Sequence, residues 1–143
     1  DHGSRLVGVC AIRKLGISDQ GKTWLATTIL PGEFGDLLAE LVANLKWVGP
    51  IEVEFIAGVD GSSPVAIEIN PRLPAWIGVA RYAGADLVRM LIELAVGASP
   101  SSPLVAAPGI CFARSYRTQS FPMRNMASFY SSGAIHFHHG VPA

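Results

Sequence analysis

Short runs of apolar residues, several of them alternating with polar ones, predict a chain rich in β-strands. The expected strands are residues 5–13, 24–30, 51–56, 65–70, 110–116 and 134–138. Residues 51–56 (IEVEFI) and 65–70 (VAIEIN) alternate with a period of two, and residues 58–63 between them are of the types that turns require. We therefore expect these two strands to form a β-hairpin, while residues 16–22 form a polar loop.

Two other segments have the period of an amphipathic helix. Leucine, valine and phenylalanine recur at steps of three and four over residues 34–45, and Gly49-Pro50 is expected to end that helix. The same spacing recurs over residues 87–94, with Gly97 at the end. Strands that return in hairpins, with helices between them, predict an α+β fold with a largely antiparallel β-sheet and flanking helices.

The composition narrows the class of protein. Eleven basic and eleven acidic residues give a formal net charge of zero, which is unlike a nucleic-acid-binding module or a polybasic membrane anchor. Half of the residues are hydrophobic and only 15% are charged, so we expect a surface covered by other parts of a larger protein or by a second copy in a homo-oligomer. A first residue that is not methionine also favours a piece of a larger protein.

No membrane or secretory segment is expected. Residues 94–113 carry no charge, but three prolines among them favour a helix end and a loop over a membrane span. No signal peptide is recognisable, and Cys10 and Cys111 fit no metal or redox spacing, so both are expected to be buried thiols. We therefore expect a cytoplasmic protein with no nucleic-acid or membrane partner.

The predicted hairpin places hard oxygen ligands on one face. If its turn centres on Gly61, Glu54 lies directly opposite Glu68, because each is seven residues from that centre. Like charges in opposed positions destabilise a sheet, and Asn70 lies two residues along the same face. Two carboxylates and an amide carbonyl suit Mg²⁺, which binds a few carboxylates together with substrate phosphates. A solvated sheet face is the alternative that this spacing leaves open.

The residues that follow favour the metal site. The run from Glu68 to Arg72 (EINPR) resembles the E-x-N-P-R signature of the ATP-grasp superfamily, with a V-E-F strand about fourteen residues upstream and an A-G-x-D-L helix start downstream. The similarity is to carboxylate–amine ligases, carbamoyl-phosphate synthetases and biotin carboxylases. It is strongest over residues 47–97 and extends over residues 5–117. It implies that residues 1–143 are a single domain, the C-terminal lobe of an ATP-grasp fold, whose lysine-bearing N-terminal lobe and adenine hinge lie outside this sequence.

The resemblance also implies roles for individual residues. The positions of Glu54, Glu68 and Asn70 hold two Mg²⁺ or Mn²⁺ ions against the phosphates of ATP, and Arg72 contacts the transferring phosphoryl group or an acyl phosphate. Two metals and a guanidinium can stabilise the charge that develops in such a transfer. The implied reaction activates a small-molecule carboxylate as an acyl phosphate, which an amine or similar nucleophile attacks. The 143 residues alone are expected not to turn over.

Further positions are implied more loosely. Arg13 and Lys14, at the end of the first strand, match basic residues that reach phosphates or the substrate carboxylate in similar proteins; strand-end surface charges are the alternative. Where biotin carboxylases have a glutamate four residues after the signature arginine, this chain has Trp76. An indole cannot act as a base, which argues against biotin carboxylation. Trp76 is expected either to line a pocket for an acyl or amino substrate or to pack in the core.

A rival motif overlaps the predicted loop. Residues 16–23 fit the P-loop pattern G-x-x-x-x-G-K-[ST], but a P-loop continues into a helix whose N-terminus meets the phosphates, and residues 24–30 predict a strand. We expect instead a loop over the nucleotide in which Lys22 contacts phosphate. The other readings left open are a P-loop nucleotidase, a non-catalytic ATP-grasp-derived binding or assembly module, and a metal site or solvated histidines at His136, His138 and His139.

Overall fold

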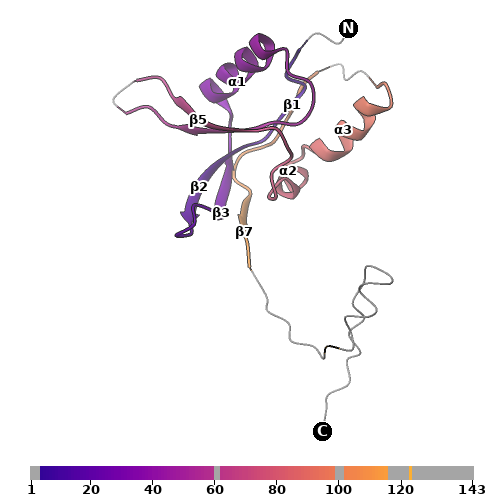
Figure 1. The fold of residues 1–143 in the computed structure, drawn as a ribbon. Coiled ribbons are helices and arrows are strands. Elements are labelled where there is room, and N and C mark those ends of the chain that lie inside the picture. The colour runs from indigo at the N-terminus through magenta and orange to yellow at the C-terminus, as the bar shows by residue number, and fades with distance from the viewer. Residues whose placement is uncertain (1–3, 60–61, 99–101, 116–122, 124–143) are drawn as a thin grey trace.

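The largest sheet among the described residues is three-stranded and antiparallel (Figure 1). The structure is a computed structural model that describes residues 4–59, 62–98, 102–115 and 123. The strands of this sheet are β2 (Ala11–Ile17), β3 (Thr23–Ile29) and β7 (Cys111–Ala113), in the order β2-β3-β7. Because β3 has a neighbour on each side, it carries the buried residues of the sheet, Ala26 and Thr28. The antiparallel return of the second strand against the first is as predicted.

The first predicted strand is divided in two. Residues 8 and 9 form β1 (Gly8–Val9), Cys10 breaks the ladder, and β2 then runs to Ile17, into the segment predicted as a loop. β1 pairs in parallel with β6 (Leu104–Val105), a pairing that the sequence did not indicate because two residues are too few to show a period. The strand predicted over 110–116 is shorter, and the strand predicted over 134–138 lies outside the described residues.

The predicted β-hairpin is present. Its strands are β4 (Glu52–Ile56) and β5 (Val65–Asn70), paired antiparallel. Glu54 pairs with Glu68, as predicted, but Phe55 pairs with Ala66 and Ile56 with Val65. The register therefore shifts by one residue beyond the acid pair. A bulge of this kind places one unpaired residue in a strand, so the continuous alternation expected for β5 is interrupted.

Three helices lie beside these strands in the described part of the chain. They are α1 (Gly32–Leu45), α2 (Gly78–Tyr82) and α3 (Leu87–Ala95). α1 ends at Lys46, whose backbone is left-handed with φ of 49°, before the predicted stop at Gly49-Pro50. Asp86 caps α3 by accepting a hydrogen bond from the backbone N–H of Arg89 at 3.0 Å, and Gly97 follows with φ of 93°. The rings of Phe34 and Phe55, 5.7 Å apart, join α1 to the hairpin.

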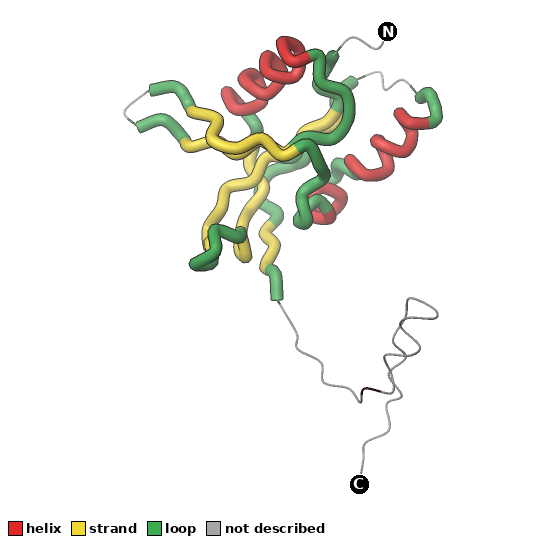
Figure 2. The backbone as a smooth tube through the Cα atoms, viewed as in Figure 1, coloured by secondary structure: helices red, strands yellow, loops and turns green. Residues whose placement is uncertain are grey.

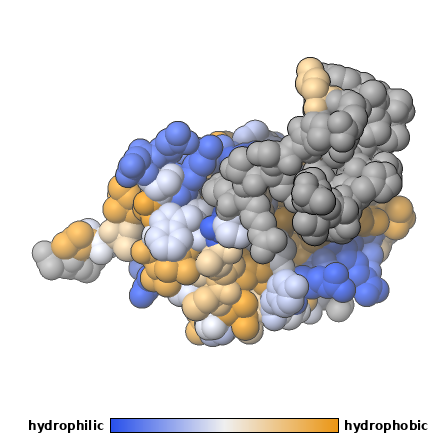
Figure 3. Space-filling view, turned by 90° about the horizontal axis from the view of Figure 1, so that it is seen from below, coloured by the Kyte–Doolittle hydropathy of each residue, from blue (hydrophilic) through white to orange (hydrophobic). Residues whose placement is uncertain are grey.

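The elements surround a small core. In Figures 1 and 2 the β4–β5 hairpin runs across the three-stranded sheet, with α1 above it and α2 and α3 to the right. A cluster of buried alanines, Ala83, Ala85 and Ala106, packs against Cys10 and Leu87 among others. Large apolar side chains also remain exposed, and Figure 3 shows one face on which hydrophobic atoms lie between hydrophilic patches. Within the described ranges, no helix has the length and apolar character needed to cross a membrane.

Candidate metal and phosphate site

Four polar side chains share one face of the hairpin. Glu54 is the cross-strand partner of Glu68, and Glu52 is the partner of Asn70. Paired residues of an antiparallel ladder project to the same side, with Cβ atoms about 5 Å apart. The bulge lies beyond Glu54, toward the turn, so it leaves these two pairs in register. The hairpin therefore brings together all three residues predicted to hold a metal.

The Glu54 carboxylate is held by a lysine from another sheet. Lys14 Nζ lies 2.5 Å from Glu54 Oε2, and the two side chains are 28% and 25% exposed. Lys14 is in β2, so this ion pair joins the hairpin to the three-stranded sheet. The ammonium supplies a positive charge next to two opposed carboxylates, which lowers the cost of placing them face to face.

The Glu68 carboxylate is satisfied within its own strand. Asn70 Nδ2 donates a hydrogen bond to Glu68 Oε1 at 2.7 Å. The amide nitrogen of Asn70 therefore faces Glu68, which leaves its carbonyl oxygen as the free acceptor of the side chain. Both residues are accessible, because β5 is exposed over most of its length.

Glu52 contacts two further residues of the candidate site, Trp76 and Arg72. Its Oε1 accepts a hydrogen bond from the indole N–H of Trp76 at 3.0 Å, and its Oε2 lies 3.6 Å from the Arg72 guanidinium. Trp76 in turn stacks on Phe112 of β7, with 6.3 Å between ring centroids and 13° between planes. With 12% of its side chain exposed, Glu52 is more enclosed than Glu54. Strand alternation places Glu52 on the same face as Glu54, but its contacts with Trp76 and Arg72 come from tertiary packing that the sequence does not indicate.

Among the described residues, neither Arg13 nor Lys22 forms an ion pair with Glu54 or Glu68. Arg13 is exposed, and strand alternation directs it to the opposite face of β2 from Lys14. Lys22 is exposed in the turn that joins β2 to β3, where its backbone N–H donates a hydrogen bond to Ser18 Oγ at 3.1 Å. Strand β3 follows this turn directly, so residues 16–23 lack the helix that a P-loop requires. The histidines at 136, 138 and 139 are outside the described residues.

The donor set suits a metal shared with phosphate better than one enclosed by protein. Across the described segments, no three His, Cys, Asp or Glu side chains converge on a point where a metal could be held. Glu54 and Glu68 offer two carboxylates, and Asn70 adds an amide oxygen. Mg²⁺ is commonly bound by one or two carboxylates together with phosphate oxygens and water. These residues could therefore supply part of the coordination of a Mg²⁺ or Mn²⁺ ion, with further ligands from outside the protein.

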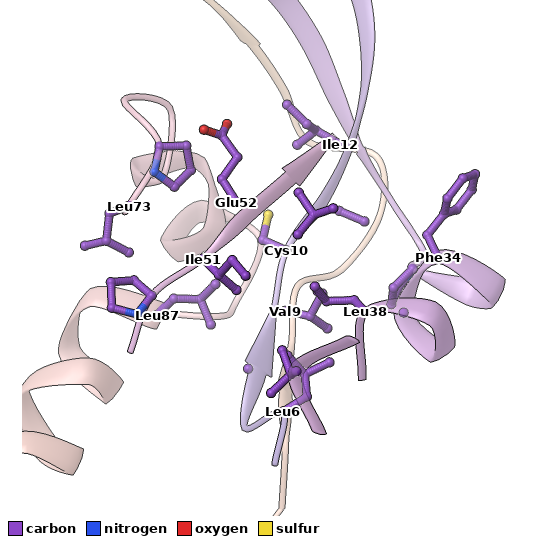
Figure 4. A pocket seen from close by; sticks show the side chains of 18 of the residues that line it. Leu6, Val9, Cys10, Ile12, Phe34, Leu38, Ile51, Glu52, Leu73 and Leu87 are labelled. Atoms are coloured by element: carbon purple, nitrogen blue, oxygen red, sulfur yellow. The ribbon is translucent and has the colours of Figure 1, made fainter. Parts of the chain in front are cut away.

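A large apolar cavity lies next to this face. Its volume is about 1480 Å³, and its walls come from β1, β2, α1, β4 and α3. Figure 4 shows apolar side chains from these elements around it, including Val9, Leu38 and Leu87, with Glu52 as the charged residue that it labels. The Cys10 thiol is part of this wall, and its burial raises its pKa from 9.0 to about 11. Lys14, Glu52 and Glu54 also form part of the wall, so the cavity adjoins the acidic groups.

No protein-family model matches this chain, and no curated protein sequence matches it. An assignment of function therefore depends on the geometry of the hairpin face and on the sequence motif that lies on it. The motif and the geometry meet at Glu68, Asn70 and Arg72, where β5 ends.

Proposed function

We propose that this chain is the metal- and phosphate-binding lobe of an ATP-grasp enzyme, a ligase that joins a carboxylate to an amine or similar nucleophile. One observation carries the proposal: the E-x-N-P-R residues lie at the end of a strand whose Glu68 is paired with Glu54 of the V-E-F strand. Opposed carboxylates destabilise a sheet, so a chain that places them together and follows them with an arginine is expected to gain a function from them.

The proposed reaction has two steps. A carboxylate oxygen of the substrate attacks the γ-phosphorus of ATP, the bond to the β-phosphate oxygen breaks, and ADP leaves. The nucleophile then attacks the carbonyl carbon of the acyl phosphate, inorganic phosphate leaves, and the nucleophile loses a proton. Bound Mg²⁺ or Mn²⁺ would supply charge neutralisation at the phosphates.

The residues of this chain would bind and orient the reacting groups. Glu54, Glu68 and Asn70 provide oxygen donors for the metal, and Arg72 can approach the γ-phosphoryl oxygens because its side chain is 60% exposed. Its planar fork suits two phosphate oxygens at once. Glu52 and Trp76 keep this region ordered next to the cavity, which is where an acyl or amino substrate would enter.

A non-catalytic ATP-grasp-derived module is the second candidate. The Lys14–Glu54 ion pair favours this candidate, because the pair joins two sheets and can have a structural role without any catalysis. A module of this kind needs no metal at the hairpin, so metal binding separates the two candidates.

The test is a thermal-shift and calorimetric titration of the 143-residue chain with Mn²⁺ and ADP. A ligand that binds only the folded state stabilises it by about 2.7 kcal/mol at a hundredfold excess over Kd. We expect this stabilisation in the wild type, its loss in Glu68→Gln, and its retention in Glu40→Gln, which removes an exposed carboxylate from α1. If the wild type does not bind Mn²⁺ with ADP, or if Glu68→Gln binds as well as the wild type, the proposed function is wrong.

A further inference from the structure

The contact between Lys14 and Glu54 places a cation where the proposed function places a metal. Lys14 Nζ lies 2.5 Å from Glu54 Oε2, and Glu54 is paired with Glu68 across the hairpin. The nearby guanidinium of Arg72 is directed to Glu52 instead. Lys14 therefore brings a positive charge to the Glu54–Glu68 pair.

We propose that Lys14 acts as a substitute for the metal, occupying Glu54 until a metal–nucleotide complex binds and then moving to the phosphates. This inference rests on the proposed function and adds that metal and nucleotide favour each other's binding. A metal ion alone must compete with the Lys14 ammonium for Glu54. When metal and nucleotide arrive together, the phosphates give Lys14 a new partner.

The chemistry of lysine suits such an exchange. Its ammonium is a compact charge with three donors on a flexible four-carbon stem, so it can leave one oxygen acceptor for another a short distance away. Both partners are about one-quarter exposed, and water can therefore reach the pair. Glu54 also belongs to the same hairpin face as Asn70, which leaves the released carboxylate among oxygen donors that a metal can use.

The exchange couples metal binding to nucleotide binding. By thermodynamic linkage, whatever factor nucleotide adds to metal affinity, metal adds to nucleotide affinity. A lysine with only a structural role, as a tie between β2 and the hairpin, would produce no such coupling. Its removal would lower stability and free Glu54 for a metal, but it would not lower the affinity for ADP in the presence of Mn²⁺.

The experiment measures Mn²⁺ binding by electron paramagnetic resonance, with and without ADP, in the wild type and in Lys14→Met. Lys14→Met is expected to bind Mn²⁺ alone more tightly, on the order of tenfold, because the competing ammonium is gone. Its affinity for ADP in the presence of Mn²⁺ is expected to fall by a similar factor, because a phosphate partner is lost. Lys14→Arg keeps a cation at Glu54 and should retain weak binding of Mn²⁺ alone.

A matched control and a second variant complete the design. Lys46→Met removes an exposed lysine that follows α1 and should leave both affinities unchanged. Lys14→Gln is the second variant, with the same opposite changes expected, in case methionine at position 14 prevents folding.

The results separate this inference from the function on which it rests. If the wild type binds Mn²⁺ with ADP, but Lys14→Met and Lys14→Gln bind Mn²⁺ alone no better than the wild type or bind ADP with Mn²⁺ as tightly as the wild type does, the inference is overturned and the proposed function stands. If the wild type binds no Mn²⁺ with ADP, both are overturned.

Discussion

The three-stranded sheet and the β4–β5 hairpin are both antiparallel, but their strands are surrounded very differently. In the sheet, β3 is covered on both edges, and its residues Ala26 and Thr28 are 0% and 1% exposed. In the hairpin, β5 is exposed at every position except its last residue, Asn70. The sheet therefore buries a neutral strand, whereas the hairpin presents a charged one.

The sheet holds buried groups that stabilise the fold, whereas the hairpin holds the charged residues of the candidate site. Thr28 is buried and satisfied, since its Oγ1 accepts the backbone N–H of Ile110 at 2.9 Å. Glu54 and Glu68 face each other and depend on Lys14 and Asn70 for favourable contacts. Buried, satisfied groups stabilise a fold, while opposed charges oppose it. The hairpin is thus the region where a substitution can raise stability and remove function together.

The largest expected effect is in the sheet, for Thr28→Val. Valine has nearly the same shape but no hydroxyl, so the N–H of Ile110 loses its acceptor in a buried position. We expect a loss of about 2 kcal/mol in the free energy of unfolding, measured by urea denaturation. Thr23→Val, at the start of the same strand, is the control and should cost much less. If the two variants lose the same free energy of unfolding, the buried hydroxyl of Thr28 is not the cause of the loss.

A smaller effect of opposite sign is expected in the hairpin, for Glu68→Gln in metal-free buffer. Glutamine keeps the oxygen that accepts from Asn70 Nδ2 and removes one of the two opposed charges. We expect a gain of about 0.5 kcal/mol in the free energy of unfolding, measured by the same denaturation in EDTA. A clear loss of stability in this variant would contradict the contrast between the two regions.

The smallest effect at neutral pH concerns Cys10, which lies between the two regions in the wall of the cavity. Burial raises its pKa from 9.0 to about 11. The folded state therefore holds the thiol proton more tightly than the unfolded state, and the resulting stability is present below pH 9 and lost as the pH rises to 11. We expect Cys10→Ala to unfold with a flatter pH dependence over that window and with no such change below pH 8.

Melting temperatures measured from pH 7 to pH 11 would check this expectation. Cys111→Ala is the control, because Cys111 is exposed rather than buried as the sequence predicted. If the two variants have the same alkaline slope as the wild type, Cys10 is not buried in the folded protein.

Local patterns predicted the elements and one important pairing. A turn centred on Gly61 predicted that Glu54 lies opposite Glu68, but the pairs nearer the turn, Phe55 with Ala66 and Ile56 with Val65, have a register that differs by one residue. Glu54 therefore faces Glu68 only because of the bulge. The bulge next to this pair was not predictable, because one extra residue in a strand changes no period in the sequence. The end of α1 at Lys46 was also missed, since glycine and not lysine is the usual left-handed residue at a helix end.

The contacts that give the site its character come from packing between distant elements. Lys14 and Glu54 are 40 residues apart, and Trp76 and Glu52 are 24 apart. Periodicity can place each residue on a face of its own element, but it does not say which faces meet. The resemblance to the ATP-grasp signature indicated Glu54, Glu68, Asn70 and Arg72. The contacts of Glu52 and the Lys14–Glu54 pair are visible only in the tertiary structure.

The parallel pairing of β1 with β6 has a consequence for the order in which this protein can fold during synthesis. Strands β2 and β3 and helix α1 have their sequence complete by residue 45, but Gly8 and Val9 must wait for Leu104 and Val105 to be made. Contacts between residues so far apart form slowly. Until then, the apolar residues around β1 are available to chaperones or to other chains, so a ribosome that stalls before residue 104 would release an aggregation-prone intermediate.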